Sequence, residues 1–275
     1  MIEYKGIKWF YYQGALLPRV PPHYEVKLTK GEEQELLKNS KALFLRYTNE
    51  WDKNGGEFWY IIKDNYDGME ELSSNTRSKV RRGIKRNRVE ELKNSYISKY
   101  GYEVYISAFK NYETFIKPLS KEQFSKQIKE NNREYFGVFD LDSNKLVAYS
   151  ENFIEDDMCH YSTIKFNPHY QKNYTSYTLI DKMNQHYLKE KQLKYVNDGA
   201  RSISHETKIQ EYLIDKFKFR RAYVRLNIAY RWDVGLVVKL LYPFRRVLER
   251  GSHPLMKKIL VILNQEKIRR SFDQP

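Results

Sequence analysis

The sequence predicts a mixed α/β protein, and three observations support this fold class. Apolar and aromatic runs over 135–140, 146–154 and 158–166 are separated by short turns rich in Asp, Ser and Asn, the pattern of an antiparallel meander. The last run enters a polar loop and then a helical pattern, with Leu179, Ile180, Met183, Tyr187 and Leu188 on one face. A strand, a helix and a strand follow, which together predict helices layered on a mixed sheet.

The first hundred residues are predicted to hold strands followed by one helix. Aromatic and β-branched residues fill 9–12, 42–47 and 58–62, and the turn formers of 54–56 separate the last two runs. Residues 72–75, Leu-Ser-Ser-Asn, offer an N-cap for the long basic helix that comes next.

Helices and strands are also predicted on either side of the meander. A helix is expected over 114–129, where it carries Phe115, Ile116, Phe124 and Ile128. Beyond the polar loop, 194–197 predict a short strand and 219–226 another one. Between them, 205–216 predict a helix with Ile209, Tyr212, Leu213 and Phe217 at helical spacing.

The tail from Trp232 is predicted to form two amphipathic basic helices, interrupted at Pro243 and Gly251. Packing of these helices against the domain is expected. Peripheral contact with an anionic membrane is the alternative, because basic amphipathic helices also lie on such surfaces.

Composition narrows the classes of partner. A net charge of +14 and a pI near 9.5 favour polyanions, anionic cofactors and acidic membranes, and are equally compatible with a lysine-rich exterior. Cys159 is the only cysteine, so an intramolecular disulfide is excluded, and its apolar strand predicts burial. The six histidines are scattered without metal-ligand spacing, so no metal is expected. Neither a signal-peptide pattern nor a membrane-spanning run is found, which predicts a cytoplasmic protein.

The segment from Phe166 to Ile180 says most about function. A strand that feeds a helix through a polar loop aims free backbone N–H groups and the positive end of a helix dipole at one place, which suits phosphate. Position by position, the loop resembles the pyrophosphate-binding loop of the GNAT acyltransferase superfamily, Pro-x-x-Gln/Arg-x-x-Gly-x-Gly/Ala. Pro168 and Gln171 fit this pattern, whereas Tyr174 and Ser176 stand where that family prefers glycines.

Two more segments resemble the Fem-like (FemAB-type) branch of the superfamily, which includes peptidoglycan aminoacyl transferases and related bacterial acyltransferases. Residues 72–85 look like the leucine-serine start and basic helix of that branch. Residues 195–220 are similar to the strand, helix and closing Gly-Phe turn of the core, with Lys218 in place of the glycine. The resemblance implies a bacterial protein with a GNAT-like catalytic core over 101–231. A partial or degenerate GNAT-like lobe would occupy 1–100, and amphipathic basic helices 232–275.

The resemblance implies the transfer of an acyl group from acetyl-coenzyme A or another acyl-coenzyme A to an amine or hydroxyl. The acceptor would be a small molecule such as an amino sugar, or a cell-envelope precursor. The loop would meet the pyrophosphate of the cofactor, and a backbone N–H beside a splayed strand would polarise the thioester carbonyl. The cofactor-binding residues implied in this way are Ile164, Lys165, Phe166, Gln171, Lys172, Asn173, Tyr174, Thr175 and Ser176.

Proton transfer is predicted at the sheet edge that faces the acyl donor in this fold. His205 and Glu206 begin a helix after the strand that ends at Asp198, and His205 has the intrinsic pKa of a general base. Helix-start chemistry is the alternative for His205 and Glu206, and a turn for Asp198. Many family members use a tyrosine as general acid, and Ile214 stands at that position. His160 is on the meander, where a hydrogen-bonded core histidine is the commoner outcome.

The basic helix is the candidate substrate-binding element. Arg77, Arg81 and Lys85 fall on one helical face together with Arg88, away from Val80 and Ile84. Such a face can grip the phosphates of nucleic acid or an anionic substrate, and it can also be simply solvated. The matching helix borders the cleft in the Fem-like branch, so a substrate-binding role is predicted for the first three, and for Arg201 beside Asp198.

Two other functions stay open. A Fem-type transferase would take its acyl group from aminoacyl-tRNA, with the positive charge binding the tRNA, although the long helical hairpin typical of that class is absent from the sequence. A non-catalytic, degenerate GNAT module would bind nucleic acid or a protein partner, in keeping with the altered loop and the missing tyrosine.

Overall fold

The computed structural model describes the chain except for residues 54, 111–116, 204–207, 250–252 and 274–275. It divides into two compact units. Unit 1 comprises Met1–Tyr60, Ala200–Thr207 and Arg221–Pro275, and unit 2 comprises Ile61–Gly199 and Lys208–Arg220. Residues from the two ends of the sequence therefore share unit 1. The division at residues 100 and 231 stays a prediction about regions of the sequence.

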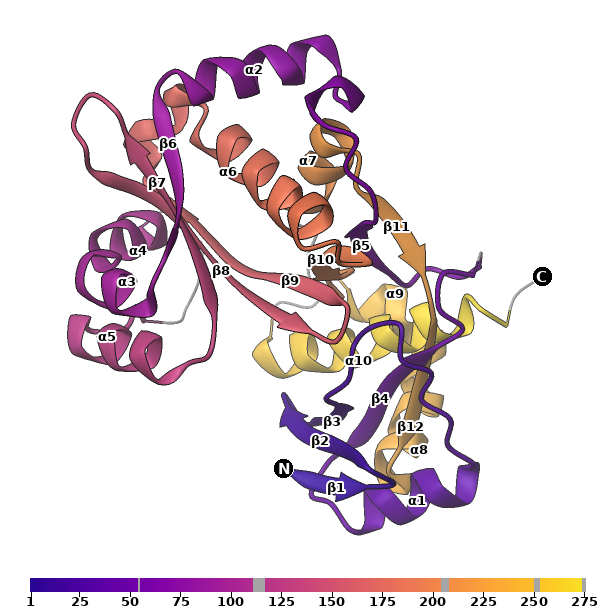
Figure 1. The fold of residues 1–275 in the computed structure, drawn as a ribbon. Coiled ribbons are helices and arrows are strands. Elements are labelled where there is room, and N and C mark those ends of the chain that lie inside the picture. Colours follow the sequence, from indigo (N-terminus) through magenta and orange to yellow (C-terminus); the bar gives the residue numbers. More distant parts are fainter. Residues whose placement is uncertain (54, 111–116, 204–207, 250–252, 274–275) are drawn as a thin grey trace. The chain divides into compact units, whose positions relative to one another are not determined.

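Most of the larger sheet belongs to unit 2 (Figure 1). Its strands follow the order β11-β5-β10-β9-β8-β7-β6. They are β5 (Trp59–Lys63), β6 (Asn87–Leu92), β7 (Glu134–Asp140), β8 (Leu146–Glu155), β9 (Met158–Phe166), β10 (Tyr195–Ala200) and β11 (Arg220–Tyr223). The predicted meander is confirmed as the antiparallel strands β7, β8 and β9, and β10 runs parallel to β9.

Helices cover both faces of this sheet. They are α2 (Ser74–Ile84), α3 (Asn94–Tyr100), α4 (Tyr102–Phe109), α5 (Lys121–Glu130), α6 (Thr175–Asn184) and α7 (Lys208–Phe217), with the short turns η1 (Met69–Glu71), η2 (Pro168–Asn173) and η3 (Gln185–Glu190). Tyr135 of β7 packs with residues of α3, α4 and α5, whereas the ring of Phe136 meets His186 and Tyr187. This follows from the alternation of side chains along a strand.

Two predicted helices differ from the sequence-based expectation. The helix expected from residue 114 is described only from Lys121. Pro118 precedes this helix, and the Ser120 hydroxyl caps it by accepting from the backbone N–H of Gln123. Phe115 and Ile116 lie outside the described residues. Ser73 caps the basic helix α2 as expected, but α2 ends at Ile84. Arg88 is therefore part of β6 and not of the basic helical face.

Unit 1 holds the smaller sheet, with strand order β1-β2-β3-β4-β12. The strands are β1 (Ile2–Tyr4), β2 (Ile7–Tyr12), β3 (Ala15–Pro18), β4 (Phe44–Asn49) and β12 (Arg225–Tyr230). The predicted strands near the N-terminus are confirmed as β2, β4 and β5. Trp9, Leu16 and Leu45 form a core with Leu36 and Leu37 of α1 (Lys30–Lys38). On the other edge of β4, β12 completes the sheet in antiparallel register, with Asn227 opposite Tyr47.

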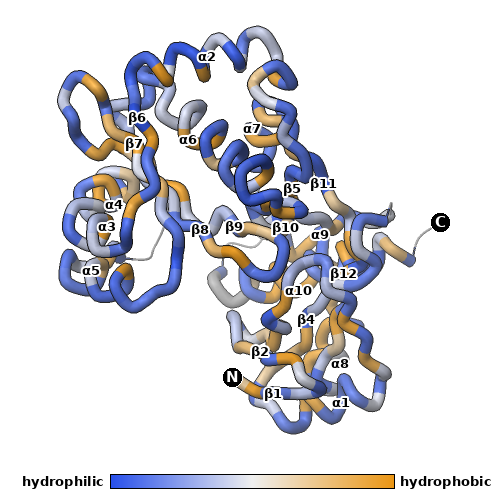
Figure 2. The backbone as a smooth tube through the Cα atoms, in the orientation of Figure 1, coloured by the Kyte–Doolittle hydropathy of each residue, from blue (hydrophilic) through white to orange (hydrophobic). Residues whose placement is uncertain are grey.

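The tail forms α8 (Trp232–Leu241), the turn η4 (Tyr242–Phe244), α9 (Arg245–Leu248) and α10 (Pro254–Arg270). The predicted break at Pro243 is confirmed by η4, and Gly251 lies outside the described residues. The second helix, α10, buries Leu263 and Ile268, whereas α8 buries only Val238 although its sequence is strongly apolar (Figure 2). Within the described part of the chain, no helix combines the length and the apolar character needed to cross a bilayer.

Candidate functional site

A fork opens between β9 and β10. The two strands pair only at Met158–Tyr195, Cys159–Val196 and His160–Asn197, yet β9 continues to Phe166. From Tyr161 onward β9 is paired with β8 on one edge, and the described residues of β10 do not continue along the other. Because a strand directs alternate N–H groups to its two edges, this stretch of β9 also has N–H groups that point away from β8. The predicted residues Ile164, Lys165 and Phe166 lie on this stretch, after a bulge opposite Glu151 and Asn152.

Asp198 is the first residue of β10 beyond the last pair with β9. It is partly buried, and this burial raises the pKa of its carboxyl to about 7. A carboxylate that titrates near neutrality can accept a proton at physiological pH, which is the property expected of a general base. The predicted site residue Asp198 thus has a raised pKa and lies where β10 separates from β9.

The neighbouring titratable groups on β9 are less suited to proton transfer. The His160 Nδ1 atom lies 2.9 Å from the Asn197 Nδ2 atom, and the ring stacks on Phe153 at 4.4 Å. Burial, and then the charge of Arg133, lower the pKa of His160 to about 4, so the ring is neutral at pH 7. Cys159 is fully buried, which raises the pKa of its thiol well above the usual range. It is a packing residue, as its strand pattern predicts.

The predicted phosphate loop lies between β9 and α6. The turn η2 leads to Tyr174, which adopts a left-handed backbone conformation (φ = 59°) directly before α6. No side chain caps α6, so its first amides are not satisfied in that way. Glycine is the residue for which this conformation has no cost, in line with the glycine that the GNAT pattern prefers at this position. Tyr174 therefore keeps the backbone turn while adding a side chain.

The basic helix α2 packs directly on this loop. A Cβ atom at Gly83 would lie 2.1 Å from the Thr178 Oγ1 atom and 3.0 Å from the Tyr174 carbonyl oxygen, so only glycine permits the approach. Just after α2, the Asn87 side-chain amide donates to the carbonyl of Asn173 over 2.7 Å, and Arg86 donates to the carbonyl of Lys172 over 3.3 Å. Sequence reasoning missed Gly83, whose only signal is a glycine inside a helical pattern.

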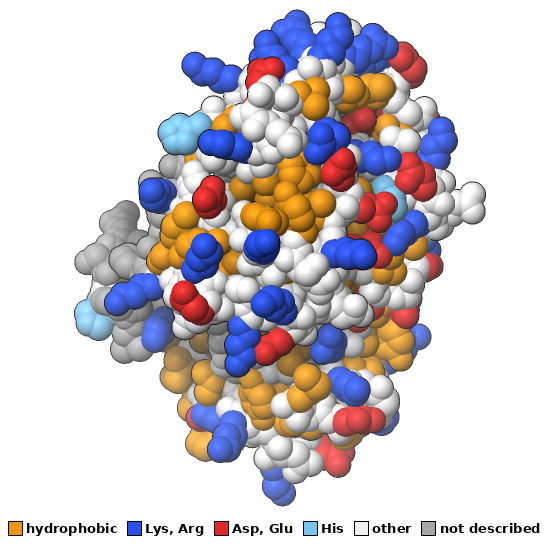
Figure 3. Space-filling view, turned by 60° about the vertical axis from the view of Figure 1, so that its left-hand side comes forward, with side chains coloured by type: hydrophobic (Ala, Val, Ile, Leu, Met, Phe, Trp, Pro, Cys, Tyr) orange, Lys and Arg blue, Asp and Glu red, His pale blue; other side chains and the backbone are white. Residues whose placement is uncertain are grey.

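The Tyr174 side chain is held against α2. Its hydroxyl accepts from the Arg82 guanidinium over 3.3 Å, and its ring centroid lies 5.9 Å from the guanidinium carbons of both Arg82 and Arg86. Lys79 donates to the Tyr177 hydroxyl over 3.3 Å. The upper part of Figure 3, at the height of α2, carries many Lys and Arg side chains. The loop thus lies within a basic and aromatic surface, to which exposed Lys172 also belongs.

A second tyrosine, Tyr212 of α7, contacts the start of α6. The Tyr212 hydroxyl lies 3.0 Å from the Ser176 Oγ atom, and its ring packs on Tyr177 at 5.6 Å. Burial raises the pKa of this phenol, so it stays protonated and can donate a proton. Sequence reasoning assigned Tyr212 only to the apolar face of a helix and found Ile214 where the family tyrosine is expected. The residue two positions earlier places a phenol against the loop.

The other predicted site residues have varied surroundings. Arg77 and Arg81 both pair with Glu70, and Lys85 is exposed. Arg201 belongs to unit 1, where it donates to the Glu57 carbonyl and stacks on Trp59 at 4.6 Å. Among the other predicted cofactor-binding residues, Gln171 is exposed, Ser176 is partly buried and Thr175 is buried. His205 and Glu206 lie outside the described residues.

Comparison with known proteins identifies the fold. No family model matches the sequence, and no curated protein matches it significantly. Among solved structures, FemX superposes with a TM-score of 0.51 over 70% of this chain and 75% of its own, at 10% identity. The C-terminal domain (DUF2156) of a putative lysylphosphatidylglycerol synthetase from Agrobacterium fabrum gives 0.52, with 85% and 83% covered and 11% identity. L-PGS from Bacillus licheniformis gives 0.55, with 96% and 86% covered and 12% identity.

These likenesses span both units of the chain and, at such low identity, they concern the fold alone. The arrangement of β7, β8, β9, α6, β10 and α7 in unit 2 is the predicted core order, and unit 1 adds the smaller sheet. The mixed α/β fold class is confirmed, and so is the GNAT-like fold that the resemblance implies. The chain has the GNAT-like acyltransferase fold in the form that FemX and the lysylphosphatidylglycerol synthetase domain display.

Proposed function

We propose that this protein is an acyltransferase that moves an acyl group from acyl-coenzyme A to an amine or hydroxyl acceptor. The observation that carries the proposal is the uncapped start of α6, flanked by Arg82, Arg86 and Lys172 at the end of the forked strand β9. Helix N-termini and guanidinium groups are both preferred partners of phosphate, so their combination suits the pyrophosphate of the cofactor.

We assign proposed roles in this reaction to residues of unit 2. A backbone N–H that points away from β8, within Ile164–Phe166, would polarise the thioester carbonyl. The nucleophilic nitrogen or oxygen of the acceptor bonds to the acyl carbon while its proton passes to the Asp198 carboxylate. The carbon–sulfur bond would then break, and the thiolate would leave with a proton from solvent. The Tyr212 hydroxyl, 3.0 Å from the Ser176 Oγ atom, would donate to the pyrophosphate at the start of α6. His205 and Glu206 remain alternative proton acceptors.

Aminoacyl-tRNA is a second candidate donor, and one observation favours it. The cations of α2 and its continuation extend beyond the length of a pyrophosphate, with Arg82, Lys85 and Arg86 all exposed. A row of cations is the electrostatic footprint of a nucleic-acid backbone. The same fork and Asp198 would serve an ester donor, and the fold is shared with FemX.

The acceptor class is proposed to belong to the cell envelope, and the tail supports a location at the membrane surface. Trp232, Leu236, Leu240 and Phe244 follow one another at intervals of four residues and are all more than half exposed. Exposed Lys239 and Arg246 accompany them. Apolar side chains combined with lysine and arginine are the features of helices that lie on anionic bilayers. We therefore propose peripheral membrane contact through α8 and α9.

Binding measurements distinguish the donors. Calorimetry with coenzyme A should show saturable binding that Lys172→Ala weakens, while Lys129→Ala, an exposed change on α5, leaves it intact. Titration with tRNA at several salt concentrations tests the second donor, for which steeply salt-dependent affinity without coenzyme A binding is expected. If neither ligand binds, the chain is a non-catalytic member of the fold and the proposal fails.

A further inference from the structure

Unit 1 contains a pocket of about 180 Å³ that the acyl-transfer site does not use. Its walls are mainly apolar and include Leu17 of β3, Val26, Phe58 and Leu226 of β12. The volume is similar to that of a cavity of roughly 150 Å³ that accommodates benzene. A small molecule with an apolar body therefore fits the space.

One wall of the pocket carries an arginine without an acidic partner. Arg46 of β4 is partly buried, and burial lowers the pKa of its guanidinium. Its Nη1 atom donates to the Gln265 Oε1 atom over 3.2 Å. Within the described part of the chain, no carboxylate lies at ion-pair distance from Arg46. A guanidinium has five donors, so most of its capacity remains for a ligand.

Hydroxyl groups add to this wall. Thr48 lies two positions along β4 from Arg46, on the same face of the strand, and its side chain is hydrogen-bonded to Tyr60. The pocket thus joins an apolar interior to a small group of donors. This is the usual composition of sites for small organic ligands.

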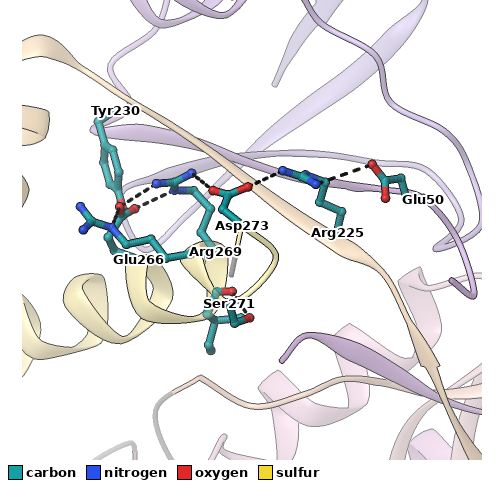
Figure 4. Close-up of polar contacts among 9 residues, drawn as sticks. Glu50, Arg225, Tyr230, Glu266, Arg269, Ser271 and Asp273 are labelled. Atoms are coloured by element: carbon teal, nitrogen blue, oxygen red, sulfur yellow. Dashed lines mark hydrogen bonds and ion pairs between the residues drawn. The ribbon is translucent and has the colours of Figure 1, made fainter. Parts of the chain in front are cut away.

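Glu266, the residue after Gln265 on α10, shows how a buried charge in unit 1 is compensated by neighbouring side chains. Glu266, whose side chain is 3% exposed, accepts from Arg269 over 2.9 Å, from Arg270 over 2.6 Å and from the Tyr230 hydroxyl over 3.1 Å (Figure 4). Arg269 and Arg225 in turn share Asp273. Buried charges are normally compensated in this manner. At Arg46, the neutral amide of Gln265 stands where a carboxylate would complete the pair.

We infer that this pocket binds a small monocarboxylic acid with an apolar body about the size of benzoate. Its carboxylate takes the free donors of Arg46 in the bidentate geometry typical of arginine, and its body packs against the apolar wall. The ligand supplies the negative charge that the protein lacks at this position. The site is independent of the acyl-transfer chemistry proposed for unit 2.

The test uses the full-length protein and calorimetry with benzoate, 4-methylbenzoate and isovalerate, with benzamide as the uncharged control. Binding of at least one acid in the range of about 10 µM to 1 mM is expected, and benzamide should bind at least tenfold more weakly. Arg46→Met should abolish binding of the acid. The control is Lys38→Met, an exposed change of a cation on α1 that should have no effect.

Gln265→Glu provides a second variant that does not remove the arginine. The new carboxylate would pair with Arg46, so the acid should bind at least tenfold more weakly, while the melting temperature of the ligand-free protein stays equal or rises. Thermal melts of all variants without ligand establish that they are folded. Equal affinity for benzamide and benzoate, unchanged binding in Gln265→Glu, or no binding of any of the acids to the wild-type protein would each overturn the inference.

Discussion

The two compact units use charged and apolar side chains in opposite ways. Unit 2 displays its cations on α2, where they contact Glu70, tyrosines and backbone carbonyls, and its exposed apolar side chains are scattered. In the described part of unit 1, Arg46 is partly buried without a carboxylate partner, and exposed apolar side chains follow one another along α8, η4 and α9. The first arrangement suits long-range attraction of a polyanion. The second suits a lipid surface and a single small acid.

The largest effect is expected at Asp198, which separates chemistry from binding within unit 2. Replacement by Asn leaves the shape but removes the proton acceptor, so kcat should fall by about 10²- to 10⁴-fold with little change in donor affinity. In the wild-type protein, kcat/KM should rise with pH through the Asp198 pKa of about 7. Steady-state kinetics from pH 5 to 9 measure both, and a variant that keeps wild-type kcat would assign the proton to another group.

The same carboxyl makes stability depend on pH. Its folded pKa of about 7 is above the ordinary value of 3.8, so the folded state binds more protons than the unfolded state between these values. The free energy of unfolding should therefore fall as pH rises from 4 to 7, by on the order of 3 kcal/mol from this group. Urea denaturation at several pH values measures this dependence. Asp198→Asn should remove the contribution of this group to the pH dependence of the unfolding free energy, and an unchanged pH dependence would contradict the assigned burial.

A change on α8 tests the apolar side of the comparison. Replacing Trp232 and Leu240 by Ser should weaken partitioning into vesicles that contain anionic lipid by roughly 10²-fold, because two apolar side chains no longer enter the bilayer. Since both residues are exposed, the melting temperature should change little. Co-sedimentation measures the partitioning, and the paired change Ile84→Ser and Ile209→Ser, on exposed residues of unit 2, is the control.

Salt dependence separates the two kinds of cationic site. Arg86→Ala should weaken donor binding about tenfold and reduce its dependence on salt, because one phosphate contact of the exposed surface is lost. Binding of a monocarboxylic acid to the Arg46 pocket should respond less to salt, since Arg46 is partly buried. Calorimetry at 50 and 300 mM salt, between which the Debye length shortens by roughly 2.4-fold, tests both. Similar slopes would remove the distinction between surface and pocket.

The smallest expected effect concerns the packing of α2. Gly83→Ala would bring a Cβ atom to 2.1 Å from the Thr178 Oγ1 atom, which requires a local shift. The helix propensity of alanine offsets part of the cost, so a net destabilisation of about 1–2 kcal/mol is expected, with weaker donor binding as α2 moves from the loop. Denaturation and calorimetry measure these effects. The acid-binding pocket should be unaffected, and increased stability would show that Thr178 simply rotates away.

Local signals in the sequence were sufficient for much of the fold. The meander and the caps depend on residues within a few positions of one another, so turn residues and alternating patterns predict them. The segment 72–75 was predicted to hold the cap of α2 in this way, and the capping residue is Ser73. Of the helix expected over 114–129, the described residues are helical only from Lys121, because the ring of Pro118 disfavours helix in the residue before it and Ser120 caps the helix.

Contacts between distant residues explain what sequence reasoning missed. Tyr212 meets Ser176, and Gly83 meets Thr178, only after the chain has folded. The isolation of Arg46 from acidic groups is a property of tertiary packing and leaves no local pattern. The loop at Gln171–Ser176 was found because a strand, a loop and a helix adjoin in sequence, whereas its basic neighbours on α2 could be placed there only through the resemblance.

The pairing of β4 with β12 has a consequence for synthesis of the chain. These strands join residues 44–49 to residues 225–230, so the edge of β4 has no partner until about four fifths of the chain has left the ribosome. An unpaired strand edge is a site for misassembly with other nascent chains. We expect this protein to depend on holding chaperones during translation, and fragments that stop before residue 225 to aggregate.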